Sequence, residues 1–156
     1  MTKTFSDDIE VRLFNMNVQY SRSVIDIQLA SAILLFEVVK ADGRIDRLEV
    51  GKVIDILREK FALGGDEIGR LLEMVSDKGN ETLHLESFTK KIREYWQQDE
   101  RLKLLKDFWV IASADQDIDE RETDLIYKIA KLLNLNDDEI NKAREHAEQK
   151  LESNKV

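Results

Sequence analysis

The amino-acid sequence predicts an all-α fold of about seven helices arranged in two pseudo-symmetric halves. Three observations support this prediction. Every clear apolar pattern after residue 24 repeats with the helical period of 3.6 residues. The chain has no proline and only six glycines among 156 residues, so it lacks the usual punctuation of strands and long loops. An acidic eight-residue motif also occurs twice along the chain.

The composition limits the classes of function. A chain of 156 residues with 42% hydrophobic residues can bury one compact core. The absence of cysteine excludes disulfides, thiolate metal sites and cysteine catalysis. The net charge of −8 disfavours binding to nucleic acid or to anionic membranes, and it favours cations or basic partners. No signal peptide or membrane span is visible, so we expect a soluble protein, and a monomer is favoured.

The first two dozen residues allow two interpretations. Ile9, Leu13, Met16 and Tyr20 recur at helical spacing, whereas Ile9, Val11 and Leu13 also alternate as in a strand. We predict a helix for this N-terminal segment, residues 1–23. We assign residues 24–152 to one helical domain with repeat units at about 29–75 and 102–150.

The first half of this domain begins with an almost continuously apolar helix. Apolar residues surround most of its circumference over 29–39, so it is predicted to be buried on most sides. Gly43 suits the left-handed residue that closes such a helix. Asp46 followed by Glu49 is a capping-box pattern that opens the next helix at about 47–61, and a break at 63–66 precedes a third helix through residue 75.

The second half follows a polar link at 76–81. Amphipathic helices are predicted at 85–96 and 102–112. Asp119 with Glu122 repeats the capping box before a sixth helix, and Asn136 with Glu139 opens a seventh that runs toward Leu151.

The internal repeat organises these elements. Residues 42–49 align with residues 115–122 at a constant offset of 73, with identities at both Asp, the Ile and the Glu. A duplicated unit that shares one core usually packs about a pseudo-twofold axis. We therefore expect the helices that end near Ala41 and Ala114 to meet at the centre, with Phe36 and Trp109 at equivalent core positions.

The repeated motif resembles half of an EF-hand calcium loop. With Gly43 at loop position 6, Asp42, Asp46 and Glu49 fall at positions 5, 9 and 12. Positions 1 and 3 would be Val38 and Lys40, or Ile111 and Ser113 in the second copy, so two ligands are missing. A complete calcium loop is excluded. A weaker site remains open if water, backbone carbonyls or the other repeat's carboxylates complete it.

A structural interpretation competes with metal binding. Asp46 and Asp119 are placed to accept hydrogen bonds from free N–H groups at the start of a helix. Glu49 and Glu122 would complete the two capping boxes, with Ile45 and Ile118 as the apolar residues just before each cap.

Capping explains Asp42 and Asp115 less well, because they follow a helix C-terminus, where the dipole disfavours negative charge. The second copy is also the more acidic one. Asp117, Glu120 and Asp124 extend it into the predicted surface for a basic partner.

Other catalytic or ligand-binding patterns are absent from the sequence. His84 and His146 lie far apart and have no partner histidine at i+4, so there is no histidine metal motif. No phosphate-binding glycine loop and no Gly-x-Ser-x-Gly motif occurs. The basic residues Lys90, Lys91 and Arg93 are predicted to be an exposed helix face.

The doubled Ala-Asp-x-x-Ile-Asp-x-x-Glu, at residues 41–49 and 114–122, resembles the tellurite-resistance protein B (TerB) family, in particular its small stand-alone bacterial branch. The resemblance covers residues 24–150. It implies a cytoplasmic, all-helical protein of two related halves, linked to resistance to tellurite and other chemical stress and without an established enzymatic activity. It also implies divalent-metal binding at six acidic residues, Asp42, Asp46, Glu49, Asp115, Asp119 and Glu122. The second copy has Gln116 where the pattern has glycine, so the two sites need not share one geometry.

The sequence thus predicts a non-catalytic helical binding module. Its acidic turns are expected to bind a divalent cation such as calcium or magnesium weakly, a basic protein partner, or one through the other. The alternative is a protein-interaction scaffold in which the acidic residues only cap helices. An enzyme is the third candidate, and it would need bound metal to activate its carboxylates.

Overall fold

The computed structural model describes residues 5–78 and 85–154, which form seven α helices and no strand within those ranges. The all-α prediction is therefore confirmed. The helices are α1 (Phe5–Lys40), α2 (Arg47–Phe61), α3 (Gly65–Lys78), α4 (Leu85–Tyr95), α5 (Gln98–Ala112), α6 (Glu120–Leu132) and α7 (Asp137–Asn154). None of these described helices is both long and apolar enough to cross a membrane.

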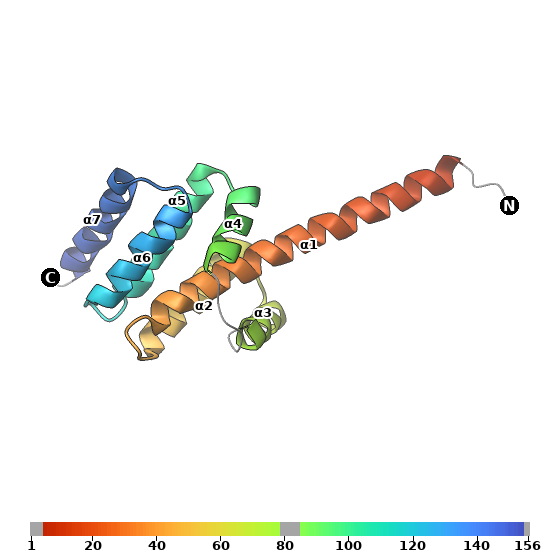
Figure 1. The fold of residues 1–156 in the computed structure, drawn as a ribbon. Coiled ribbons are helices and arrows are strands. Elements are labelled where there is room, and N and C mark those ends of the chain that lie inside the picture. The colour runs from red at the N-terminus through yellow and green to blue at the C-terminus, as the bar shows by residue number, and fades with distance from the viewer. Residues whose placement is uncertain (1–4, 79–84, 155–156) are drawn as a thin grey trace.

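Helix α1 has 36 residues and is continuous from Phe5 to Lys40. The helical interpretation of the N-terminal segment is confirmed for residues 5–23, and residues 1–4 lie outside the described residues. The segment boundary expected after residue 23 lies inside this helix. Figure 1 shows the second half of α1 packed into the helical body, while its first half extends away from the other helices. Among the side chains of α1 that the structure describes, Ile27 is the first buried one along the chain.

The helices form two equivalent three-helix units, α1–α3 and α5–α7, joined by α4. Within the units, α1 packs on α2 and α3, and α5 packs on α6 and α7. Between the units, α2 packs on α5 while α6 packs on α1. These reciprocal contacts are those of a pseudo-twofold arrangement, and α1 and α5 also pack against each other, as the repeat predicts.

The core is not equally deep in the two halves. Trp109 on α5 is fully buried and packs edge-to-face against Tyr127, with ring centroids 6.0 Å apart. Phe36, its counterpart on α1, is only half-buried and packs at the margin of the core. The expectation that both rings lie in the core is therefore wrong for Phe36. The inner face of α1 is instead filled by aliphatic side chains such as Leu34 and Val38.

The turns that follow α1 and α5 share one backbone conformation. Gly43 has φ +78° in the first turn, and Gln116 has φ 67° at the equivalent place in the second. The left-handed backbone conformation is favourable for glycine and less so for glutamine, which has a Cβ atom. The glutamine thus does not change the course of the second turn.

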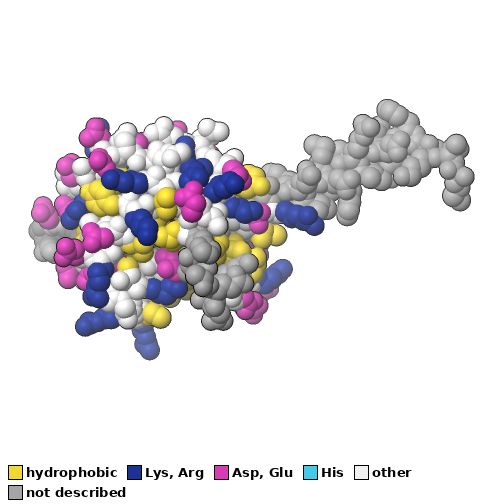
Figure 2. Space-filling model, viewed as in Figure 1, with side chains coloured by type: hydrophobic (Ala, Val, Ile, Leu, Met, Phe, Trp, Pro, Cys, Tyr) yellow, Lys and Arg dark blue, Asp and Glu magenta, His cyan; other side chains and the backbone are white. Residues whose placement is uncertain are grey.

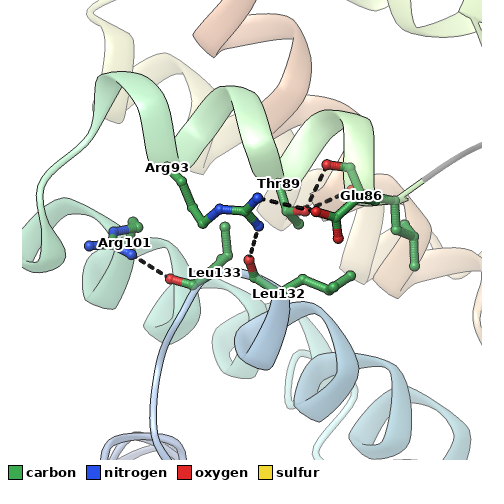
Figure 3. A network of polar contacts seen from close by, with 7 residues as sticks. Glu86, Thr89, Arg93, Arg101, Leu132 and Leu133 are labelled. Carbon is green, nitrogen blue, oxygen red and sulfur yellow. Dashed lines mark hydrogen bonds and ion pairs between the residues drawn. The ribbon is translucent and has the colours of Figure 1, made fainter.

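Two arginines from neighbouring helices bind the C-terminal end of α6 (Figure 3). Arg93 of α4 donates to the carbonyl oxygen of Leu132, and Arg101 of α5 donates to that of Leu133 over 2.6 Å. Arg93 also pairs with Glu86 at 3.1 Å. Carbonyl groups at a helix C-terminus lack intrahelical donors, and cations are favourable there. The sequence-based expectation of an exposed basic face is therefore wrong for Arg93, which is half-buried.

Candidate functional site

Two glutamates meet at the junction between the halves. Glu49 lies in the first turn of α2 and Glu122 in the first turn of α6, at equivalent positions of the repeat. Each is only 1% exposed, and their carboxyl groups interact with each other. The pseudo-twofold arrangement thus places two like-charged groups face to face inside the protein.

The buried carboxylate oxygens of this pair receive no hydrogen bond from the part of the chain that the structure describes. Both side-chain oxygens of Glu49 and Oε2 of Glu122 are buried without a hydrogen-bonding partner when both groups are charged. Burying an unpaired carboxylate is costly, so the pair favours retention of a proton. A proton on Glu122 can be donated to Glu49, which relieves part of this cost.

The pKa values of both groups are raised. Burial is the largest cause for each, because desolvation disfavours the charged form. Hydrogen bonding to Glu49 and the charge of Glu49 further raise the pKa of Glu122, whereas the same hydrogen bond partly opposes the rise at Glu49. Asp42 and Asp115 add negative potential at both glutamates.

Asp42 and Asp115 occupy matching positions in the two turns. In each case Oδ1 accepts a hydrogen bond from the backbone N–H two residues later, at 2.9 Å from Arg44 and 3.1 Å from Asp117. The preceding helices end at Lys40 and Ala112, so both aspartates belong to the turns rather than to the helices. Their turn geometry uses one carboxylate oxygen and leaves the other for a further interaction.

Asp46 and Asp119 are helix N-caps, as the sequence predicts. Oδ1 of Asp46 accepts from the N–H of Leu48 at 2.7 Å and from that of Glu49 at 3.3 Å. Oδ1 of Asp119 accepts from the N–H of Arg121 at 2.8 Å, and this hydrogen bond is the main cause that lowers the pKa of Asp119. These two residues therefore have a structural role whatever else they bind.

Glu49 and Glu122 do not complete capping boxes, so that part of the capping interpretation is wrong. Their carboxyl groups turn toward each other instead of back to the preceding backbone. A reciprocal box does form at α7, where Asn136 and Glu139 exchange backbone-to-side-chain hydrogen bonds of 3.0 and 2.8 Å.

The two isoleucines of the motif also differ. Ile118 packs against the core, whereas Ile45 is 72% exposed. The expected apolar contact just before the helix cap is therefore missing in the first copy. Leu48, in the first turn of α2, is also exposed, at 62%.

The chemistry of the acidic centre suits a hard divalent cation. All six candidate ligands offer carboxylate oxygen, which calcium and magnesium prefer. In this structure, however, no three acidic or histidine side chains among residues 5–78 and 85–154 converge as a finished metal site. Glu49 and Glu122 nevertheless interact with each other and carry buried carboxylate oxygens without a hydrogen-bonding partner.

The expected partner surface lies outside this centre. Asp117, Glu120 and Asp124 are all exposed around the second turn and the start of α6. Arg121, the cation among them, pairs with Asp119 at 3.3 Å. His146 is exposed on α7, and His84 lies outside the described residues.

Sequence reasoning missed the burial and pairing of the two glutamates, although a signal was present. Glu49 stands four and eight residues before the buried Val53 and Leu57, and Glu122 stands four residues before the buried Ile126. Residues at this spacing share one face of a helix. Both acids thus lie in line with core residues at equivalent positions, which predicts that they point inward together.

Comparisons with known proteins agree with this architecture. No curated protein and no solved structure matches the chain. A family model described as Tellurite resistance protein TerB matches residues 28–145, which span most of the chain and include both acidic turns and the two facing glutamates. The chain therefore belongs to the TerB family.

Proposed function

We propose that this protein is a non-catalytic binding module whose acidic centre takes up a divalent cation. Glu49 and Glu122 are the central ligands, since their carboxyl groups meet in a buried place without a compensating donor. Asp42 and Asp115 complete the coordination from the two turns. Asp46 and Asp119 contribute their remaining oxygens, because one oxygen of each already caps a helix.

One observation carries this proposal: an unpaired, like-charged glutamate pair is buried at the junction of the two halves. A divalent cation there would neutralise both carboxylates and coordinate the oxygens that lack a hydrogen-bonding partner. Binding must displace the proton that the pair retains, and it must reorient the turn aspartates. Both requirements weaken affinity, so we expect a dissociation constant of about 10⁻⁴–10⁻³ M for calcium or magnesium.

Calorimetric titration and thermal melting with calcium or magnesium test this proposal. Wild type is expected to bind with measurable heat and to melt at a higher temperature, because a ligand of the native state stabilises it by mass action. Glu49→Gln and Glu122→Gln should abolish both responses. Glu73→Gln removes an exposed carboxylate on α3 and is the matched control.

The opposite result would support the scaffold interpretation. If wild type gives no heat and no melting shift at several millimolar metal, well above the proposed dissociation constant, the acidic residues serve only the fold. The retained role would then be protein interaction through the exposed acids Asp117, Glu120 and Asp124, which favour a basic partner.

The family points to a cellular context for this module. We propose a role in resistance to tellurite and other chemical stress, exerted by binding rather than by catalysis. A deletion strain complemented with wild type or with Glu49→Gln would test it. Loss of resistance in the deletion and in the Glu49→Gln strain alone would tie the phenotype to the acidic centre.

A further inference from the structure

The two turns of the repeat carry opposite charge on their exposed surfaces. In the first turn and the start of α2, the exposed charged side chains that follow Lys40 are Arg44, Arg47 and Lys52. In the second turn and the start of α6, the exposed acids are Asp115, Asp117, Glu120 and Asp124. We name these sets the basic turn and the acidic turn.

At two equivalent positions of the repeat, a basic residue in the first copy corresponds to an acidic residue in the second. With the offset of 73, Arg44 corresponds to Asp117 and Arg47 corresponds to Glu120. Among the described residues, the acids of the first turn form no ion pair with Arg44 or Arg47. Asp42 and Asp46 are half-buried and engaged with backbone N–H groups, and Glu49 is buried.

The basic turn also presents two aliphatic side chains to solvent. Ile45 is 72% exposed and Leu48 is 62% exposed, three residues apart. At the equivalent places of the acidic turn, Ile118 packs on the core and Arg121 is ion-paired with Asp119. Two exposed aliphatic side chains beside Arg44 and Arg47 offer a partner a small apolar contact.

The two turns lie side by side at one end of the molecule. The contact of Glu49 with Glu122 joins the beginnings of α2 and α6. Lys52 and Gln116 line the same surface hollow, so the edges of the basic and acidic turns adjoin. In Figure 2, Lys and Arg side chains project around the lower end of the body, where Figure 1 places the α1–α2 turn.

We propose that this end of the molecule is a self-complementary interface between two copies of the chain. A twofold axis in the plane of this end places the basic turn of each copy opposite the acidic turn of the other. Both contacts form at once, as an isologous interface requires. Ile45 and Leu48 are the apolar contacts, and the charged residues fix the orientation.

The charges themselves point to a second copy as the occupant. Among residues 5–78 and 85–154, no ion pair engages Arg44, Arg47 or Lys52, and none joins the two turns within one chain. Each chain therefore presents a basic turn and an acidic turn that do not pair with each other within that chain. The proposal replaces the monomer favoured by the sequence. It rests on the partner-binding role proposed for the acidic turn and not on cation binding.

The interface is small, so the dimer is weak and sensitive to salt. Two turns bury less surface than a standard stable interface, and ion pairs exposed at a rim add little affinity when salt screens them. Sedimentation equilibrium of the full chain at low salt, with protein up to about 1 mM, is therefore the suitable measurement. We expect the average mass to rise from 18.2 kDa toward twice that value, and to return to the monomer at high salt.

A charge-swap experiment identifies the surface. Arg44→Glu with Arg47→Glu makes both turns acidic, and Asp117→Lys with Glu120→Lys makes both turns basic. Each double variant alone should lose self-association at least tenfold. An equimolar mixture should recover it, because each acidic turn then faces a basic one. Ile45→Ser with Leu48→Ser should also weaken association, while Ile25→Ser, at an exposed aliphatic residue on α1, should not.

The outcomes separate this proposal from cation binding. Circular dichroism of each variant establishes that it is folded, and calcium titration of the same samples reports on the acidic centre independently. A wild type that remains monomeric at low salt overturns the proposed dimer. An association that survives both charge reversals overturns the assigned surface, and so does a mixture that stays monomeric.

Discussion

The carboxyl groups of Glu49 and Glu122, 73 residues apart in the chain, interact with each other inside the fold although both are acids. Each lies at the beginning of a helix, and the two helices belong to different halves. Duplication of one motif about a pseudo-twofold axis brings any residue near that axis against its own counterpart. The same geometry that repeats the fold therefore creates a site with two identical ligands.

Stability should fall as pH rises through the neutral range. Burial and neighbouring acids raise the pKa of Glu49 from 4.5 to about 7 and that of Glu122 from 4.5 to about 9. Between pH 4.5 and about pH 9 the native state binds more protons than the unfolded state. The free energy of unfolding therefore decreases with increasing pH over this range. Urea unfolding at pH 5, 7 and 9 without divalent metal would measure this slope. A stability that increases over this range contradicts the retained proton.

Removing one charge of the pair should stabilise the metal-free protein. In Glu122→Gln the amide can donate a hydrogen bond to Glu49 without the proton that Glu122 must retain in the native state. We expect a gain of about 1–3 kcal/mol at pH 8 and little change at pH 5, where the pair already holds protons. Urea unfolding at both pH values provides the comparison, and an equal gain at both would argue against an electrostatic origin.

Capping and cation binding can be separated at the turn residues. Asp46→Ala should lose about 1 kcal/mol of stability because a helix loses its cap, whereas Asp46→Asn should be nearly neutral without metal. If Asp42 and Asp115 are ligands, changing either to Asn should reduce the melting shift caused by calcium. Thermal melts with and without calcium test both statements. An unchanged calcium shift in both Asn variants would remove the turn aspartates from the site.

The asymmetry of the core should be visible in truncation variants. Trp109→Ala removes a fully buried ring and should cost about 3–5 kcal/mol. Phe36→Ala removes a half-buried ring and should cost less, because part of that ring already contacts solvent. Chemical denaturation of the two variants gives the comparison. Equal losses would show that the halves are packed alike after all.

The end of α6 offers a test of the contact between halves. Arg93→Ala leaves the carbonyl of Leu132 without its side-chain donor and breaks the pair with Glu86. We expect a loss of about 1–3 kcal/mol, the usual cost of a buried polar group deprived of its partner. Lys90→Ala on the exposed face of the same helix is the control and should be nearly neutral.

The helices could be predicted because their signals are local. Apolar spacing, glycine at the turns and the capping aspartates each act within a few residues, so the sequence predicts seven helices and the repeat. The exposure of Ile45 and the half-burial of Phe36 could not be predicted this way. They depend on how α1 and α5 are covered by other helices, which is a tertiary property.

The six acids of the two motifs remain predicted metal ligands, and the structure confirms only the N-cap roles of Asp46 and Asp119. Local capping rules assigned Glu49 and Glu122 to the preceding backbone, whereas packing of α2 against α5 and of α6 against α1 turns them toward each other. The sequence alone indicates the opposite charge of the two turns, but it does not indicate which of their charged side chains are exposed.

Helix α4 has no counterpart in the duplication, yet it touches α1 of the first unit and α6 of the second. Through Arg93 it also closes the end of α6. Removing either unit would therefore leave one face of α4 without its packing partner. Because α4 and the shared core hold the two units together, the outer turns can differ in charge without disturbing the fold.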